Sequence, residues 1–174
     1  MTTKTLFDKD LTLEEAKKLI KNGADVNQQS TIGRTPLFYA LNVEVAELFI
    51  NLGANVNQKD NSGSTPLHKA YFTSTIKLLI KNGANINAKD NQGFFVLDYQ
   101  YDIDNIKYLI DHGAIGRRKT YQKFREYFSV EQQKAFDAFI SITNNDDEFY
   151  QICLAYQNDI KNHVKIEIKE MDIL

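Results

Sequence analysis

The sequence predicts an all-α repeat solenoid of helix–turn–helix units with β-turn fingers, capped by C-terminal helices. Glycine followed by alanine recurs every thirty residues, at Gly23, Gly53, Gly83 and Gly113. Thr-Pro-Leu at 35–37 and 65–67 has the same spacing, as do the Val-Asn or Ile-Asn pairs at 26–27, 56–57 and 86–87. A fixed period of this size is typical of stacked units that bury their apolar faces only against their neighbours.

The segment 60–87 shows the pattern of one unit most completely. Gly63 permits a turn with positive φ, and Thr65 begins a short helix whose next residue is proline. Apolar residues at helical spacing between Ile76 and Ile80 predict a second helix, which Gly83 ends. The unit is therefore a β-turn, a helix, a turn and a second helix.

Three motifs in this unit resemble the ankyrin repeat family: T-P-L-H at 65–68, L-L-I-K-N-G-A at 78–84, and D-x-x-G-x-T at 60–65. The family's usual period is ~33 residues, and the residues missing here fall between Ala70 and Gly83, so we expect a shorter inner helix or a tighter interhelical turn. The resemblance implies a protein-binding scaffold without catalysis. It also implies that His68 ties adjacent units together.

The repeat stack is predicted to span residues 1–116, in units of about 5–34, 35–64, 65–94 and 95–116. The first unit has a polar inner segment and a capping box at Thr12–Glu15, as expected of a terminal unit that faces solvent. The fourth unit keeps the outer helix, but Phe95, Val96 and Asp98 replace the threonine, proline and histidine of the signature.

Residues 117–174 are predicted to form a helical C-terminal cap or extension. A basic run at 117–125 is interleaved with aromatic residues. It has two interpretations: a patch for nucleic acid or an anionic membrane, or, as we favour, the solvated face of a helix whose aromatic side chains pack inwards. Another capping box at Ser129–Gln132 predicts a further helix, and the alternation at 163–174 is consistent with a strand or a frayed tail.

The composition excludes several classes of protein. A net charge of −2 argues against nucleic acid as a general partner. The single cysteine, Cys153, precludes an internal disulfide, and no apolar run approaches the ~20 residues that span a bilayer. We therefore expect a cytoplasmic protein with no membrane partner, although a signal for specialised export into a host cell would escape these rules.

No pattern in the sequence predicts catalysis. The three histidines stand in unrelated contexts, and no metal-ligand spacing, nucleophile motif or phosphate-binding glycine loop is present. We therefore predict no enzyme activity, no cofactor and no metal. The resemblance instead implies that partners bind the concave face formed by the turn tips and inner helices.

The predicted partner-binding residues lie at turn tips and at inner-helix positions of that face. They are Ile32, Arg34, Ser62, Ser64, Tyr71, Phe72, Gln92, Phe94 and Tyr101. Aromatic residues and arginine dominate binding energy at protein interfaces, and nothing in the packing of the repeat itself calls for a phenyl ring at Phe94. The alternative is that these rings fill space within a shortened unit.

Asn27 is a candidate for modification. The segment 19–27 resembles the leucine-to-asparagine pattern that an asparagine hydroxylase modifies in ankyrin proteins of animal cells. The structural interpretation, an asparagine that binds the backbone of the hairpin, applies equally to Asn57 and Asn87 and is favoured.

Two hypotheses of function follow. The first is a monomeric scaffold that binds one protein, as an adaptor or as an inhibitor or immunity-type protein that blocks a toxin or enzyme; self-association through the aromatic residues is a variant of it. The second is a bacterial or viral effector whose activity resides in residues 117–174, with the repeats as its targeting part.

Overall fold

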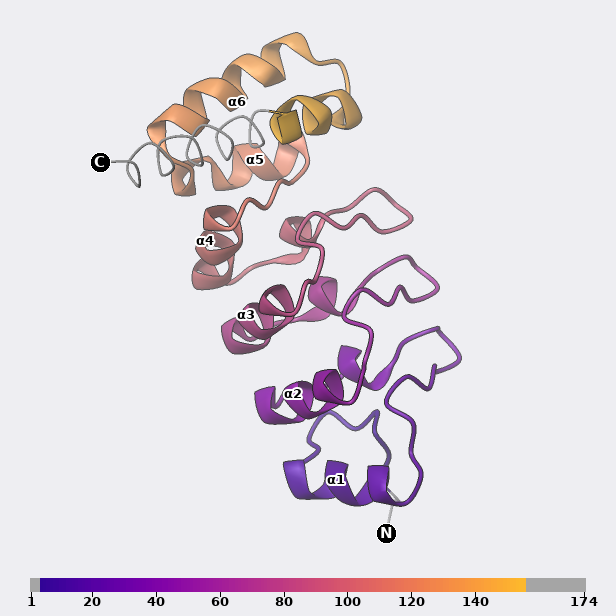
Figure 1. The fold of residues 1–174 in the computed structure, drawn as a ribbon. Coiled ribbons are helices and arrows are strands. Elements are labelled where there is room, and N and C mark those ends of the chain that lie inside the picture. The colour runs from indigo at the N-terminus through magenta and orange to yellow at the C-terminus, as the bar shows by residue number, and fades with distance from the viewer. Residues whose placement is uncertain (1–3, 156–174) are drawn as a thin grey trace, which may run out of the picture.

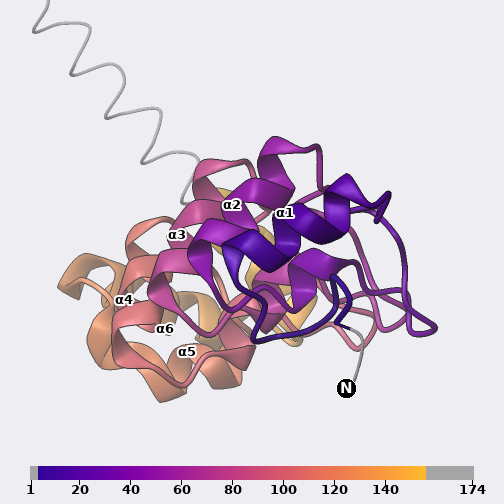
Figure 2. The same cartoon turned by 90° about the horizontal axis from the view of Figure 1, so that it is seen from below.

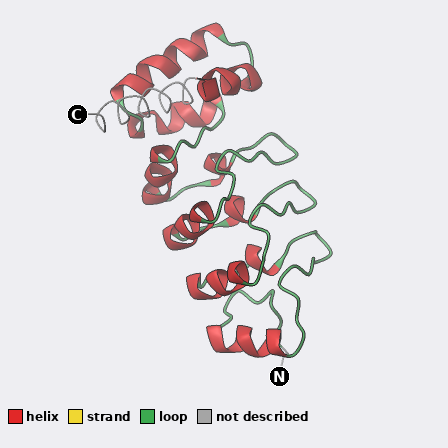
Figure 3. Ribbon diagram, in the orientation of Figure 1, coloured by secondary structure: helices red, strands yellow, loops and turns green. Residues whose placement is uncertain are grey.

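The computed structural model describes residues 4–155, and its regular structure is helical (Figure 3). Within this range the only β-type pairing is one isolated bridge between Lys89 and Phe95. Four outer helices of nine residues each lie one above the other: α1 (Leu13–Lys21), α2 (Val43–Asn51), α3 (Thr73–Lys81) and α4 (Ile103–Asp111) (Figure 1). The all-α repeat solenoid predicted from the sequence is confirmed.

Each inner helix is reduced to a single 3₁₀ turn. These turns are η1 (Pro36–Phe38), η2 (Pro66–Lys69) and η3 (Val96–Tyr99). A 3₁₀ turn needs fewer residues than the two-turn helix of a longer unit, which accounts for the thirty-residue period. The expected shortening of the inner helix is thus confirmed, and the fourth unit keeps its turn although it has lost the Thr-Pro signature.

The outer helices begin and end at the residues that the repeat pattern indicated. Thr12 and Glu15 form the predicted capping box of α1. Gly83 has a φ of +84° just beyond α3, and its N–H donates to the carbonyl of Ile80 at 3.0 Å; the equivalent glycines of the other units make the same bond at 2.9 Å. Each outer helix is therefore ended by a residue in the left-handed conformation, which only glycine adopts without strain.

The core runs continuously through the stack because equivalent positions of successive units are buried together. Leu37, Leu67 and Leu97, one from each inner turn, are all buried. Phe49 of α2 and Leu79 of α3 lie on the inward faces of the outer helices and are also buried. Each such side chain contributes roughly 1.5–3 kcal/mol of burial free energy, and adjacent units provide the surface that covers it.

Helices after residue 116 close the end of the stack. They are α5 (Arg118–Phe124), η4 (Arg125–Tyr127), α6 (Val130–Ile142) and a last helix described over 146–155. The rings of Tyr121, Phe128, Phe136 and Phe149 form a cluster with centroids 5.0–6.2 Å apart. Seen from the N-terminal end in Figure 2, these helices lie beyond the outer helices of the repeats.

The predicted C-terminal helices are therefore confirmed, as is the capping box at Ser129 and Gln132. The boundary at residue 116 stays a prediction. The strand or tail considered for 163–174 lies outside the described residues.

Candidate functional site

Between the repeats, the chain makes three projecting loops that we call fingers, at 30–34, 60–64 and 90–94 (Figure 1). In each, the first and last residues pair through the backbone; Asp60 N–H, for example, donates to the Ser64 carbonyl at 2.9 Å. Six predicted partner-binding residues lie in the fingers: Ile32, Arg34, Ser62, Ser64, Gln92 and Phe94.

The other three predicted residues, Tyr71, Phe72 and Tyr101, do not lie on an inner helix. The inner turn η2 ends at Lys69, so Tyr71 and Phe72 belong to the connection that leads into α3. Tyr101 occupies the same connection in the next unit. The predicted set is therefore divided into two rows, one before each inner turn and one after it.

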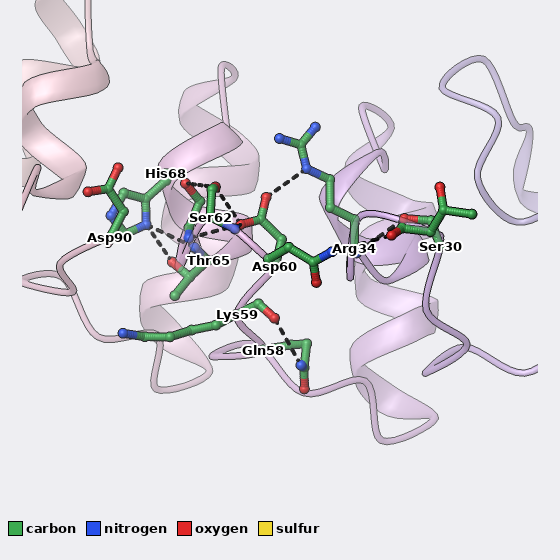
Figure 4. A network of polar contacts seen from close by, with 12 residues as sticks. Ser30, Arg34, Gln58, Lys59, Asp60, Ser62, Thr65, His68 and Asp90 are labelled. Carbon is green, nitrogen blue, oxygen red and sulfur yellow. Dashed lines mark hydrogen bonds and ion pairs between the residues drawn. The ribbon is translucent and has the colours of Figure 1, made fainter. Parts of the chain in front are cut away.

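A buried carboxylate organises the second finger (Figure 4). Asp60 accepts hydrogen bonds from the N–H groups of Ser62 and Ser64 at 2.9 and 3.0 Å, and from Nε of Arg34 at 2.9 Å. Burial alone raises the pKa of Asp60, but the hydrogen bond from the Ser62 hydroxyl, at 2.6 Å, and the three bonds above outweigh it, so the pKa lies below its usual value. Asp90 holds the third finger in the same way, through Gln92 and Phe94.

Besides Ser62, which donates to Asp60, three predicted finger residues are engaged within the fold. The side chain of Ser64 is fully buried, which removes it from any contact surface. Arg34 is half-buried, bound to Asp60. The ring of Phe94 lies 3.7 Å from the guanidinium of Arg117 and 6.0 Å from the ring of Tyr99. Arg117 of the cap therefore packs against Phe94, a contact outside the repeat that the repeat pattern did not indicate, and the role of Phe94 in binding stays a prediction. Ile32, Ser62 and Gln92 are exposed.

Asparagines join successive fingers. The N–H of Asn61 donates to the carbonyl of Ile32 at 3.0 Å, and its side-chain amide donates to Thr31 at 3.3 Å. Asn91 repeats both contacts one unit later, with Ser62 at 2.9 Å and Asn61 at 3.1 Å. We call this series the finger ladder.

A second ladder joins the ends of the outer helices. Asn57 Nδ2 donates to the carbonyl of Gly83 at 2.9 Å, and its Oδ1 accepts from Asn85 N–H at 2.8 Å. Asn27 and Asn87 make the same pair of contacts with the units that follow them. The favoured interpretation of Asn27 as a structural asparagine matches this geometry, and its modification stays a prediction.

Exposed apolar side chains form a row along the connections. Leu41, Tyr71 and Tyr101 stand thirty residues apart, and Phe72 follows Tyr71; we call these four residues the connection row. The exposed fractions of Tyr71, Phe72 and Tyr101 are 65%, 51% and 80%. Leu41, Tyr71 and Phe72 together line a hollow between the second and third units. Leu41 therefore shares both the exposure and the thirty-residue register of the two tyrosines.

Phe72 also breaks the capping pattern of the outer helices. At the equivalent position, Asn42 caps α2 and Asp102 caps α4 through a side-chain oxygen, and Thr12 caps α1. Phe72 has the same extended backbone, with φ −92° and ψ 132°, but offers no acceptor. Loss of such a cap costs about 1 kcal/mol, so the third unit carries a phenyl ring at the surface at some expense of stability.

His68 is hydrogen-bonded within its own unit and meets the next unit only through a ring contact with Tyr99, so the implied tie between units is not seen among its hydrogen bonds. Its Nδ1 accepts from Thr65 N–H at 3.0 Å, so the neutral ring carries its proton on Nε2 (Figure 4). Nε2 is buried and has no hydrogen-bond partner among the described residues. Burial lowers the pKa of His68, and the nearby Phe94 carbonyl and Asp90 charge only partly oppose it.

The basic run is occupied by internal contacts. Arg117 binds Asp98 at 3.2 Å, and Arg125 binds Asp137 at 2.6 Å. Arg118 donates to the carbonyl of Ile140 at 3.1 Å. These contacts, together with the buried aromatic residues of α5, favour the interpretation of this segment as a cap.

Residues 4–155 contain no cluster of side chains suited to a metal ion. Burial raises the pKa of Cys153 to about 12, so its thiol stays protonated and is a poor nucleophile. In the same range, no helix has the length and apolarity needed to cross a membrane.

Comparison with known proteins identifies the repeats. Residues 9–90 match the model for ankyrin repeats in three copies. No curated protein matches the chain. Ankyrin repeats generally mediate protein–protein interaction and are typically non-catalytic. Residues 9–90 are therefore ankyrin repeats, in agreement with the resemblance seen in the sequence.

Proposed function

We propose that this protein is a non-catalytic scaffold that binds a protein partner, with the connection row as its principal contact. The observation that carries the proposal is Phe72, a half-exposed phenyl ring at the one outer-helix N-terminus among α1–α4 that lacks a capping side chain. Stability alone favours asparagine or aspartate there. A surface aromatic residue kept at such a position is accounted for by a contact with another molecule.

The neighbouring residues support the same use. Tyr71 and Tyr101 lie one unit apart and are the most exposed aromatic residues of the repeats. Large exposed rings lose little side-chain entropy on binding and bury a large apolar area. Leu41, one unit before Tyr71, is also exposed and extends the row by one unit.

The test is capture of the partner from a lysate of the source cell, followed by mass spectrometry. The row variant carries Tyr71→Ser and Tyr101→Ser. A matched control carries Val130→Ser and Ile142→Ser on α6, where the exposed fractions are similar, at 66% and 68%. Circular dichroism establishes that both variants fold.

We expect one protein to be captured by the wild type and by the α6 control but lost from the row variant. Equal capture by the row variant would contradict the proposed surface, and loss from the α6 control alone would move the contact to the C-terminal helices.

A further inference from the structure

The two asparagine ladders end differently at the C-terminal side of the stack. The ladder at the helix ends is complete, because Asn87 binds the carbonyl of Gly113 and the N–H of Ile115 in the fourth unit. The finger ladder stops at the third finger, since the fourth unit leads into the cap without making another finger. Among residues 4–155, no group donates to the carbonyls of Asn91 and Gln92.

Glycines show how each finger receives the next one. A Cβ placed on Gly33 would lie 2.4 Å from Oδ1 of Asn61, and one on Gly63 would lie 2.3 Å from Oδ1 of Asn91. The bare backbone of each glycine therefore forms a slot that an asparagine fills. Gly93 has the same conformation, with φ +81°, but no described atom lies within 4 Å of its Cβ position.

We infer that the slot at Gly93 binds an asparagine from a loop of a partner protein, which adds a fourth finger to the ladder. The chain itself displays the ligand geometry twice. In both filled slots, the asparagine gives its backbone N–H to the third residue of the preceding finger and its side-chain amide to the second residue. In the third finger these acceptors are the carbonyls of Gln92 and Asn91, and both are open.

The surroundings of the slot keep it in shape without a ligand. Asp90 fixes the finger from within by accepting from the N–H groups of Gln92 and Phe94, both at 2.9 Å. Arg117 stacks on Phe94 from the side of the cap. An incoming loop therefore meets acceptors that are already placed, which reduces the entropic cost of binding.

This inference rests on the proposed function only in taking a protein as the ligand, and it concerns a different surface from the connection row. The probe is a cyclised peptide with the sequence of the second finger, residues 59–65. Its matched control carries Asn61→Ala. Both are titrated into the full ¹⁵N-labelled chain, and amide chemical shifts are recorded.

Two or three hydrogen bonds on a preformed edge give a Kd of about 1 mM or weaker. We expect saturable shifts at Gln92, Gly93 and Phe94 with the finger peptide, and at least a fivefold weaker response with the Asn61→Ala peptide. The row variant with Tyr71→Ser and Tyr101→Ser should bind the peptide unchanged, so failure of this test is separate from failure of the proposed function.

A variant of the protein tests the slot directly. Gly93→Ala places a methyl group where the asparagine would sit, with no internal clash, and should abolish the shifts. Gly23→Ala is its control, because Gly23 also has positive φ, at +94°, and open space around its Cβ, but ends α1 far along the stack.

Three results would overturn the inference. They are equal chemical-shift changes with both peptides, binding of the peptide by Gly93→Ala as strong as by the wild type, and no chemical-shift changes at a peptide concentration fivefold above the expected Kd of about 1 mM. Contacts from residues 156–174 to Gly93 in the free chain would do so as well, because the slot would then be filled internally. The inference would also be overturned if the chemical shifts of these amides changed with protein concentration in the absence of peptide. That result would show that a second copy of the chain binds the edge.

Discussion

Asp98 occupies in the fourth unit the place that His68 occupies in the third, thirty residues earlier. Both accept the N–H at the start of their own inner turn, at 2.7 Å from Phe95 for Asp98 and at 3.0 Å from Thr65 for His68. The carboxylate of Asp98 additionally binds Arg117 and accepts from the hydroxyl of Thr120. The replacement of the signature histidine by Asp98 therefore connects the last repeat to its cap.

Replacing Asp98 by asparagine should weaken this connection. The side chain of Asp98 is only 1% exposed, and Asp98→Asn would leave the partly buried Arg117 without its counter-ion. We expect a loss of about 1–3 kcal/mol in the free energy of unfolding, measured by urea denaturation followed by circular dichroism. Asp102→Asn is the control, because asparagine also caps α4 and should change stability by less than about 0.5 kcal/mol. Equal effects of the two substitutions would contradict the assigned connection.

Phe72 allows the cost of the missing cap to be measured. Phe72→Ala and Phe72→Asn both remove the ring, but only asparagine restores a capping oxygen to α3. We therefore expect Phe72→Asn to be more stable than Phe72→Ala by about 1 kcal/mol in urea denaturation. Asn42→Ala at the equivalent position of α2 should lose a similar amount, since Asn42 Oδ1 accepts from Glu44 N–H at 2.8 Å. Equal stability of the two Phe72 variants would show that the site does not act as a cap.

The sequence predicted the repeat architecture because glycine, proline and the apolar positions act locally, within one unit. The end of the inner turn was harder to predict, since the period shows how many residues separate Thr65 from Gly83 but not how they are divided between inner turn, connection and outer helix. Tyr71 and Phe72 were consequently assigned to the wrong element.

Phe94 and Ser64 show a different limit. The partner of Phe94 is Arg117, which lies in the cap, and no repeat register predicts a contact between a finger and a segment outside the repeats. Ser64 is buried because the finger folds back on Asp60. Such positions depend on the three-dimensional path of the finger, and the order of residues in a turn tip does not reveal it.

His68 should make the stability of the protein depend on pH in a defined window. Because burial lowers its pKa in the folded state, the unfolded chain takes up a proton first as the pH falls below the ordinary value of 6.5. The free energy of unfolding should therefore decrease as the pH falls below about 6.5 toward the lowered pKa of the folded state. Asp90 partly opposes the shift in pKa, whereas the charges of Lys69 and Lys59 add to it.

The comparison variant is His68→Gln, which keeps an acceptor for Thr65 N–H and does not titrate. Urea denaturation at pH 7.5, 6.5, 5.5 and 5.0 should give a flatter dependence on pH for this variant than for the wild type. The lowered pKa of Asp60 and Asp90 acts below this window, near 3.8 and lower. Parallel curves for the two proteins would assign the pH dependence to another group.

Substitution of two glycines with nearly the same backbone conformation allows the cost of conformational strain to be distinguished from the cost of a close contact. Gly63 and Gly93 have φ values of +78° and +81°, so alanine at either position incurs the same cost of a left-handed conformation, about 1–2 kcal/mol. At Gly63 the new methyl group would also meet Asn91, 2.3 Å from Oδ1 and 2.7 Å from the backbone nitrogen, whereas at Gly93 it would meet nothing. Gly63→Ala should thus lose a further 1–3 kcal/mol, roughly the cost of overpacking. Equal losses of unfolding free energy in urea would show that Asn91 moves aside freely, and that the slots between fingers are not the close contacts on which the finger ladder depends.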